Sequence, residues 1–219
     1  MKKIVLLALM TFTVALGTTD LHAQNDSKAK ALLDQVHQTV KSYDNIFIDF
    51  NYVLENTAEN IRQETRGDVT LKGDKYRFNY LGATKIFDGS KTYTIIPENE
   101  EVVIEDAGSE EQGTITPSKM LTFYENGYTY KWDITQNVKG RNIQYIELVP
   151  IDSNSEISKI LLGIDTQTKH IYNLIEVGQS GTKTTITVNS FKTDQPISKS
   201  LFTFDGPKYE EMGYYIINN

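Results

Sequence analysis

Asp88, Gly89 and Ser90 place a carboxylate beside a hydroxyl, between two apolar stretches of the chain. A carboxylate and a hydroxyl are components of nucleophilic catalysis when a base accompanies them. Neither a base nor a metal ligand accompanies Asp88 in the neighbouring sequence. Asp-Gly is also the dipeptide that tight hairpins prefer, because Gly accepts a positive φ and Asp hydrogen-bonds to its own backbone. The stretch is therefore interpreted as a hairpin corner.

The remaining candidates for catalysis are equally incomplete. His37 and His170 lack a metal-binding spacing such as His-x-x-x-His, so each is interpreted as a surface histidine. Gly178-Gln-Ser-Gly181 lacks the Gly-x-Ser-x-Gly spacing of a nucleophile elbow, and it joins two strands instead of a strand and a helix. The chain contains no Cys, which excludes thiolate chemistry and disulfides. We expect a protein that is not an enzyme and that needs neither cofactor nor metal; a hydrolase is the least favoured class.

The charge is acidic, with 22 basic and 29 acidic residues and a net charge of −7. This balance argues against nucleic acid and anionic membranes as partners, because both require a basic surface. The densest acidic run, residues 98–111, lacks the spacing of a calcium-binding loop. It is interpreted as a solvated loop after a strand, with a docking edge for a basic partner as the alternative.

The N-terminus has the pattern of a secretion signal. Met1-Lys2-Lys3 is basic, Ile4–Leu16 is apolar, and Ala23 is a suitable residue before a cleavage site. A buried first helix is the alternative, but no amphipathic stripe accompanies the run. We expect residues 1–23 to be a cleaved signal peptide and residues 24–219 to form one soluble domain, since no later segment is long and apolar enough to span a membrane.

The mature chain begins with a helical period and then changes to a period of two. Apolar residues at helical spacing predict an amphipathic helix over about Ser27–Tyr43. After it, alternating residues and Gly-bearing turns predict antiparallel strands up to a last strand at Leu201–Phe204. Pro117–Glu125 interrupts the alternation and is predicted to be a short helix, because Thr116 can cap it and Gly127 can end it. The fold class is mainly β, with two helices.

One sheet with two short helices leaves two arrangements open. The apolar side chains either interdigitate as an ordinary core or, if the sheet curves, enclose a hydrophobic hollow that suits a fatty ligand. Strand parity predicts the wall of this hollow, although a register slip of one residue would reverse a strand. The predicted wall residues are Ile48, Phe50, Tyr52, Val69, Leu71, Phe78, Tyr93, Ile95, Leu148, Leu162 and Ile164. The predicted lid residues are Leu33, Val36 and Val40 of the first helix and Met120, Leu121, Phe123 and Tyr124 of the second.

Several stretches, in their order and spacing, resemble the LolA family of periplasmic lipoprotein carriers. They include Ala31–Val36, Ile46–Phe50, Gly67–Leu71, Lys75–Phe78, Phe87-Asp-Gly89 with Tyr93, Thr116–Leu121, Leu148-Val-Pro150, Ile164-Asp165 and Leu201–Phe204. The resemblance runs from about residue 28 to 205. It implies a strongly curved antiparallel sheet that forms an incomplete barrel, lidded by helices, with a hollow for acyl chains.

The resemblance also implies a function and partners. Such a carrier takes acylated lipoproteins from an inner-membrane ABC transporter and delivers them across the periplasm to an outer-membrane acceptor, either LolB-like or of unknown type. The soluble carrier fits this chain better than LolB, which is acylated on a Cys. We expect a periplasmic monomer. The alternative function is a sensor or adaptor of the same fold that binds a lipid or an envelope protein without transporting lipoproteins.

The chain departs from the family at one position. Many members have an Arg-Pro after the strand that resembles Gly67–Leu71, and that Arg is thought to hold the lid shut. Here Gly73 stands at the corresponding position, followed by Asp74. The resemblance therefore does not supply a lid latch for this chain, and it identifies neither the bound lipid nor the lipoproteins carried.

Overall fold

The computed structural model describes residues 26–108 and 117–218. Its strands form one twelve-stranded sheet in the order β12-β6-β5-β4-β3-β2-β1-β11-β10-β9-β8-β7. Every pairing is antiparallel except that of β12 with β6. The sheet does not close into a barrel, since β12 and β7 are its two edges. The predicted mainly β class with an incomplete barrel is confirmed; the predicted signal peptide lies outside the described residues.

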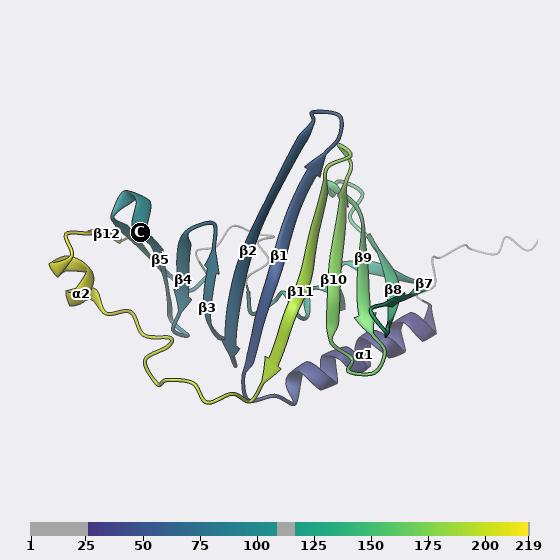
Figure 1. Cartoon of the computed structure of the whole chain (residues 1–219), viewed down its shortest axis with the longest axis horizontal. Coiled ribbons are helices and arrows are strands. Elements are labelled where there is room, and N and C mark those ends of the chain that lie inside the picture. The colour runs from purple at the N-terminus through teal and green to yellow at the C-terminus, as the bar shows by residue number, and fades with distance from the viewer. Residues whose placement is uncertain (1–25, 109–116, 219) are drawn as a thin grey trace, which may run out of the picture.

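The first half of the sheet is a meander of hairpins. Its strands are β1 (Ile46–Asn56), β2 (Ile61–Lys72), β3 (Lys75–Tyr80), β4 (Ala83–Phe87), β5 (Lys91–Ile96) and β6 (Glu101–Asp106), with the 3₁₀ helix η1 (Pro97–Asn99) between the last two. The second half is a meander of β7 (Tyr128–Val138), β8 (Arg141–Pro150), β9 (Ile157–Asp165), β10 (Ile171–Gly178) and β11 (Lys183–Thr193). The pairing of β1 with β11 joins the two halves in the middle of the sheet (Figure 1).

Asp26 both caps helix α1 (Ser27–Lys41) and connects the start of the helix to β7. The Asp26 side chain accepts hydrogen bonds from the N–H groups of Lys28 (2.8 Å) and Ala29 (3.2 Å), as an N-cap does. The same carboxylate accepts a bond from the Trp132 N–H of β7 at 3.3 Å. Ala29, Leu32, Leu33 and Val36 form the buried stripe of the helix and belong to the main hydrophobic cluster. The helix lies beside the half of the sheet that holds β7–β11 (Figure 1).

The predicted second helix over Pro117–Glu125 is wrong. The segment from Pro117 to Thr122 consists of consecutive turns, and only Phe123–Glu125 forms a single 3₁₀ turn, η2. Its hydrogen bonds span three residues, as in the bond from the Met120 N–H to the Pro117 carbonyl at 3.3 Å. An apolar composition and a favourable first Pro were not sufficient for an α-helix, because short segments depend on tertiary packing for their conformation.

The C-terminal segment forms structure that the sequence patterns did not predict. Leu201–Phe204 is not a strand; the chain passes the ends of β1, β2 and β3 and reaches α2 (Gly206–Glu211) and β12 (Tyr215–Asn218) (Figure 1). This segment covers a second, smaller cluster on β4, β5 and β6, in which Ile86, Ile95 and Val102 are buried. The sheet therefore has apolar packing on both faces: the main cluster on the face next to α1, and this cluster on the other.

Candidate functional site

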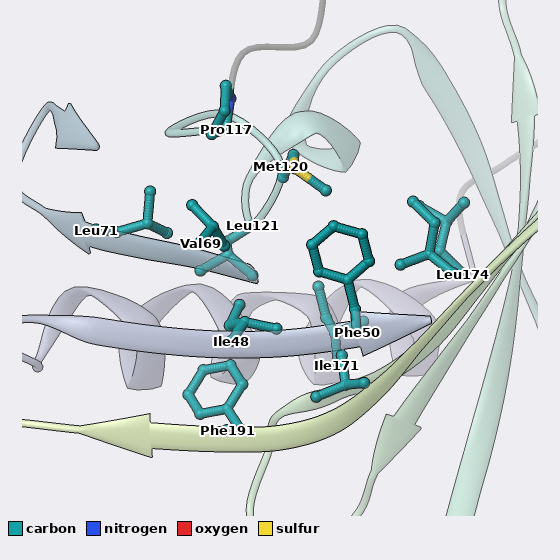
Figure 2. A pocket seen from close by; sticks show the side chains of 12 residues that line it. Ile48, Phe50, Val69, Leu71, Pro117, Met120, Leu121, Ile171, Leu174 and Phe191 are labelled. Atoms are coloured by element: carbon teal, nitrogen blue, oxygen red, sulfur yellow. The ribbon is translucent and has the colours of Figure 1, made fainter. Parts of the chain in front are cut away.

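An apolar cavity of about 50 Å³ lies on the α1 side of the sheet, at the junction of the two halves. Figure 2 shows its lining, which comes from β1, β2, β10, β11 and the segment after residue 116. The lining residues are Ile48, Phe50, Val69, Leu71, Pro117, Met120, Leu121, Ile171, Leu174, Ile186, Val188 and Phe191. No lining side chain carries a charge or a hydrogen-bonding group, so the cavity suits a hydrocarbon.

Strand register brings the lining residues of β1, β2 and β11 together. Ile48 stands opposite Val69 on one side and Phe191 on the other. Phe50 stands opposite Val188 and opposite Gly67, whose lack of a side chain leaves room for the Phe50 ring. A Cβ at position 67 would lie 2.5 Å from Cζ of Phe50. Because paired residues point to the same face, these rows form a continuous apolar wall.

Residues 117–125, the lid segment, cover this wall. Leu121 and Tyr124 are buried in the main cluster, and Phe123 packs against it. The Tyr130 hydroxyl of β7 donates a hydrogen bond to the Tyr124 carbonyl at 2.8 Å, and His37 of α1 contacts the Glu125 carboxylate. These contacts attach the C-terminal end of the segment, and Pro117, Met120 and Leu121 in its N-terminal part face the apolar cavity (Figure 2).

Two larger cavities flank the lid segment. One, of about 330 Å³, lies between the end of α1, the β2–β3 turn and Ser118, Leu121 and Thr122. The other, of about 290 Å³, lies between Ser118, Lys119 and the side chains of Tyr76, Phe87 and Thr92. Leu121 borders both the first of these and the apolar cavity. The lid segment thus separates spaces that would be continuous if it moved away.

The structure brings part of the predicted wall together at the cavity. Ile48, Phe50, Val69, Leu71, Met120 and Leu121 line it. The other predicted members of the main cluster pack around the cavity without lining it: Leu33, Val36, Val40, Tyr52, Phe78, Phe123, Tyr124, Leu148, Leu162 and Ile164. Pro117, Ile171, Leu174, Ile186, Val188 and Phe191 were missed, although the alternation of Ile186 and Val188 was a usable signal. Ligand binding by these residues stays a prediction.

Tyr93 and Ile95 were placed on the wrong face. Both belong to the second cluster, where Tyr93 stacks on Phe204 with ring centres 4.7 Å apart. Pairing of Tyr93 with Ile86 and of Ile95 with Thr84 puts all four on the face opposite to Tyr76, whose partner on β4 is Phe87. On β5, Thr92, Thr94 and Ile96 share the face of Tyr76.

Asp88 is a structural residue of the β4–β5 turn. Its carboxylate accepts hydrogen bonds from the N–H groups of Ser90 and Lys91, both at 2.8 Å, and from the Tyr93 hydroxyl at 3.0 Å. Burial opposes ionisation of Asp88, but these bonds prevail and lower its pKa to about 2. The turn thereby orients Tyr93 toward the C-terminal segment, and the interpretation as a hairpin corner agrees with this geometry.

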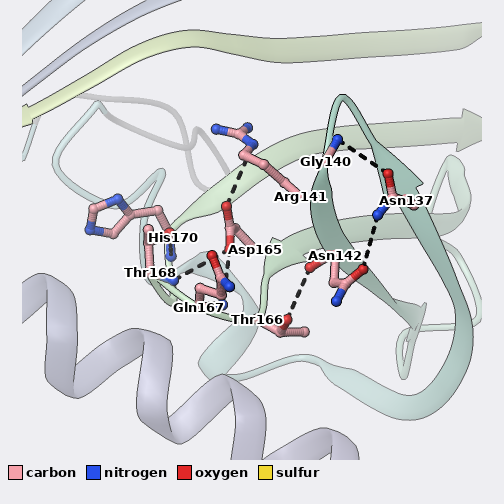
Figure 3. A network of polar contacts seen from close by, with 9 residues as sticks. All are labelled: Asn137, Gly140, Arg141, Asn142, Asp165, Thr166, Gln167, Thr168 and His170. Atoms are coloured by element: carbon pink, nitrogen blue, oxygen red, sulfur yellow. Dashed lines mark hydrogen bonds and ion pairs between the residues drawn. The ribbon is translucent and has the colours of Figure 1, made fainter.

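His170 belongs to a polar turn that supports the cavity wall. In the β9–β10 turn, the Asp165 side chain accepts bonds from the N–H groups of Gln167 (2.9 Å) and Thr168 (3.3 Å), and it pairs with Arg141 at 3.5 Å (Figure 3). The turn holds His170 against Phe191, a lining residue, with ring centres 4.0 Å apart. His170 is therefore half-buried, more enclosed than the prediction of a surface histidine implied.

The surroundings of His170 lower the pKa of its imidazole. Burial lowers the pKa of the imidazole, with Arg141 acting in the same direction and Asp165 opposing both. Its Nε2 lies 2.9 Å from the Tyr43 hydroxyl. Within the described residues, no three or more His, Asp or Glu side chains gather in a way that would hold a metal ion.

Comparison with known proteins identifies the family of this chain and solved structures of similar fold. The sequence model of the family described as outer membrane lipoprotein carrier protein LolA matches residues 25–205. The chain belongs to the LolA family. No curated protein matches it. Among solved structures, this LolA-family chain resembles an uncharacterised conserved protein from Thermus thermophilus (TM-score 0.56, 9% identity, covering 88% of this chain and 99% of that one). It also resembles LprF from Mycobacterium bovis (TM-score 0.50, 11% identity, covering 80% and 97%).

Two features of this LolA-family protein bear on its match to the family. Gly73, at the position where the resemblance implies a latch Arg, has a φ of 55° in the β2–β3 turn and borders the cavity of about 330 Å³. A Cβ there would meet no atom within 4 Å, so the position is open space. The helix α2 and the strand β12, which cover much of the second cluster, follow the last residue matched by the family model.

Proposed function

We propose that this protein is a periplasmic carrier that shields the acyl chains of lipoproteins and moves them from the inner to the outer membrane. The observation that carries the proposal is the apolar cavity between the sheet and a lid segment that rests on it by apolar contacts. Membership of the LolA family supports the same function. No helix within residues 26–108 and 117–218 is long and apolar enough to cross a bilayer.

The cavity volume requires that the lid segment move. A cavity of about 150 Å³ holds one benzene molecule, whereas this cavity measures about 50 Å³. An acyl chain therefore enters only if residues 117–122 leave the wall and the flanking cavities become part of one hollow. Met120 suits such a surface, because Met side chains repack easily.

The energy of acyl-chain burial is large enough to drive this movement. Each buried CH₂ contributes about 0.8 kcal/mol, so a chain of about 16 carbons gains roughly 12 kcal/mol if it is fully shielded. A carrier must also release its cargo, and the work of displacing the lid segment lowers the net affinity. In this mechanism the protein receives lipoproteins from an inner-membrane ABC transporter and gives them to an outer-membrane acceptor, and it acts by binding, without catalysis.

Mass spectrometry of the protein purified from periplasm tests the proposal. A photo-crosslinking residue at Ile48, inside the cavity, is expected to trap acylated lipoproteins. The same residue at Ile134, a 55% exposed position on β7, serves as the control. Trapping of free lipid, or of an envelope protein without acyl chains, would support a sensor or adaptor instead. Equal trapping at both positions, or none at Ile48, would contradict a carrier function.

A further inference from the structure

A carboxylate stands on the apolar face of the sheet, close to the cavity. Glu176 of β10 is two residues beyond Leu174, which lines the cavity, so the two side chains share a face at a spacing of about 7 Å. The register between these residues is unbroken, because the irregularities of β10 lie before Asn173 and after Val177. Glu176 therefore belongs to the same wall as the cavity, one row further along the strands.

The neighbours of Glu176 in this row are mostly apolar. On β9 it pairs with Ile160, which is 1% exposed, and on β11 with Thr184. The row continues to Leu148 on β8 and to Leu54 on β1. A carboxylate in such a row costs folding free energy unless it has a partner. An apolar residue would complete the wall at a lower cost.

Glu176 has no partner among the described residues. No hydrogen bond or ion pair joins it to any residue in 26–108 or 117–218. Burial alone raises the pKa of its carboxyl, as expected where no cation offsets the loss of water. Glu147 of β8, by contrast, contacts Lys159 at 2.8 Å.

A second polar group lies close to Glu176 and to the lid segment. Burial, and to a lesser extent the Glu176 carboxylate, raise the pKa of Tyr128 on β7. The Tyr128 ring packs edge-to-face on Phe123 of the lid segment, with centres 5.9 Å apart. Glu176 and Tyr128 thus place polar atoms beside an otherwise apolar hollow, where the head of a bound amphiphile would lie.

We propose that Glu176 accepts hydrogen bonds from a cationic, N–H-bearing head group of an amphiphile whose apolar chain occupies the cavity. The assignment rests on the proposed function, because it requires a hollow that admits an acyl or alkyl chain. An ammonium group supplies the positive charge and the N–H donors that Glu176 does not find among the described residues. The ligand class is therefore a single- or multiple-chain lipid whose polar end carries an amine.

Calorimetric titration with two detergents of equal chain length tests the assignment on the full-length protein. Dodecylammonium carries the donor and the charge, and dodecyl maltoside is neutral. Glu176→Gln should weaken dodecylammonium binding about tenfold, the usual effect of one charge-assisted hydrogen bond, and should leave dodecyl maltoside binding unchanged. Glu64→Gln, an exposed acidic position on β2, removes the same charge from the protein and should affect neither detergent.

The outcomes separate the two proposals. If both detergents bind and Glu176→Gln weakens them equally or not at all, the head-group contact is wrong while the hollow stands. If neither detergent binds to the wild-type protein, the carrier function itself is contradicted. Thermal melting checks folding, because Glu176→Gln removes a half-buried carboxylate that has no partner among the described residues, and the variant should melt no lower than the wild type.

Discussion

Truncation of Leu121 tests whether the lid segment must leave the wall before a lipid can bind there. Leu121 is 5% exposed and borders the apolar cavity and the cavity beside the end of α1. In the unliganded protein its side chain fills space that an acyl chain would need. Leu121→Ala should therefore destabilise the unliganded state and strengthen lipid binding, a combination of opposite signs.

The magnitudes follow from burial and from the neighbouring space. Truncation of a buried Leu to Ala costs about 2–5 kcal/mol. Leu121 already borders two cavities, so fewer contacts are lost, and we expect a decrease of about 2 kcal/mol in the free energy of unfolding. If ligand binding requires this side chain to leave its site, the same free energy no longer opposes binding. The affinity then rises by up to about 30-fold.

Urea unfolding measures the stability, and calorimetric titration with dodecyl maltoside measures the affinity. Ile95→Ala is the matched control, because Ile95 is 2% exposed in the second cluster on the opposite face. It should lose similar stability without changing the affinity. The reasoning is refuted if Leu121→Ala binds the detergent no more tightly than the wild type. Leu121 would then stabilise the detergent-bound protein as much as the protein whose lid segment rests on the wall.

Three further predictions concern the residues around the site. The pKa of Asp88 is about 2 in the folded protein, against an ordinary value of 3.8. Ionised Asp88 should therefore add about 1 kcal/mol, after solvent screening, to the free energy of unfolding above about pH 4, and this contribution should be lost as the pH falls toward 2. Urea unfolding of Asp88→Asn should lack this pH dependence. Burial lowers the pKa of His170 below its ordinary value of 6.5, so the imidazole binds a proton more readily in the unfolded chain than in the fold. The free energy of unfolding should therefore fall as the pH drops below about 6.5, and His170→Gln should remove this decrease. The explanation is wrong if the variant keeps the same dependence of stability on pH. Deletion of residues 206–219 uncovers the second cluster; the melting temperature should fall by at least about 5 °C and a hydrophobic dye should bind, while detergent affinity stays unchanged because the cavity lies on the other face.

The strands and the first half of the wall were predictable because local patterns determine them. Ile48 and Phe50 alternate with polar residues in β1, and Val69 and Leu71 alternate in the strand that pairs with it. A hairpin keeps such pairs on one face, so parity within each strand was enough. The helical spacing of apolar residues likewise located α1, which the structure starts at Ser27 after the capping Asp26.

The remaining features depend on contacts between distant segments. Thr92 and Thr94 face the same side as Tyr76, and the more apolar Tyr93 and Ile95 face the C-terminal segment, which a parity argument without that segment cannot anticipate. The irregularity at Asp49/Phe50 in the β1–β11 pairing shifts which residues of β11 face the wall. The Asp205 cap and the Pro near the start of α2 were a readable helix signal, but the helix has only six residues.

The pairing of β1 with β11 has a consequence for when the apolar cavity forms during folding. Apart from the short parallel pairing of β12 with β6, every other pairing in the sheet joins strands adjacent in sequence, whereas this one joins Ile46 to Thr193. Hairpins with local contacts form early in folding, and a long-range pairing bears the cost of closing a large loop. We expect the two meanders to form first and to dock last.

The cavity lies on this late-forming junction, since Ile48, Phe50 and their partners on β11 all line it. A chain that ends at β10 contains the whole first meander and four strands of the second, but no complete wall. The apolar cavity is therefore complete only after β11, which ends at Thr193, has paired with β1. Under the proposed carrier function, capture of an acyl chain is therefore one of the last events that folding makes possible, whatever the stage at which the first meander forms.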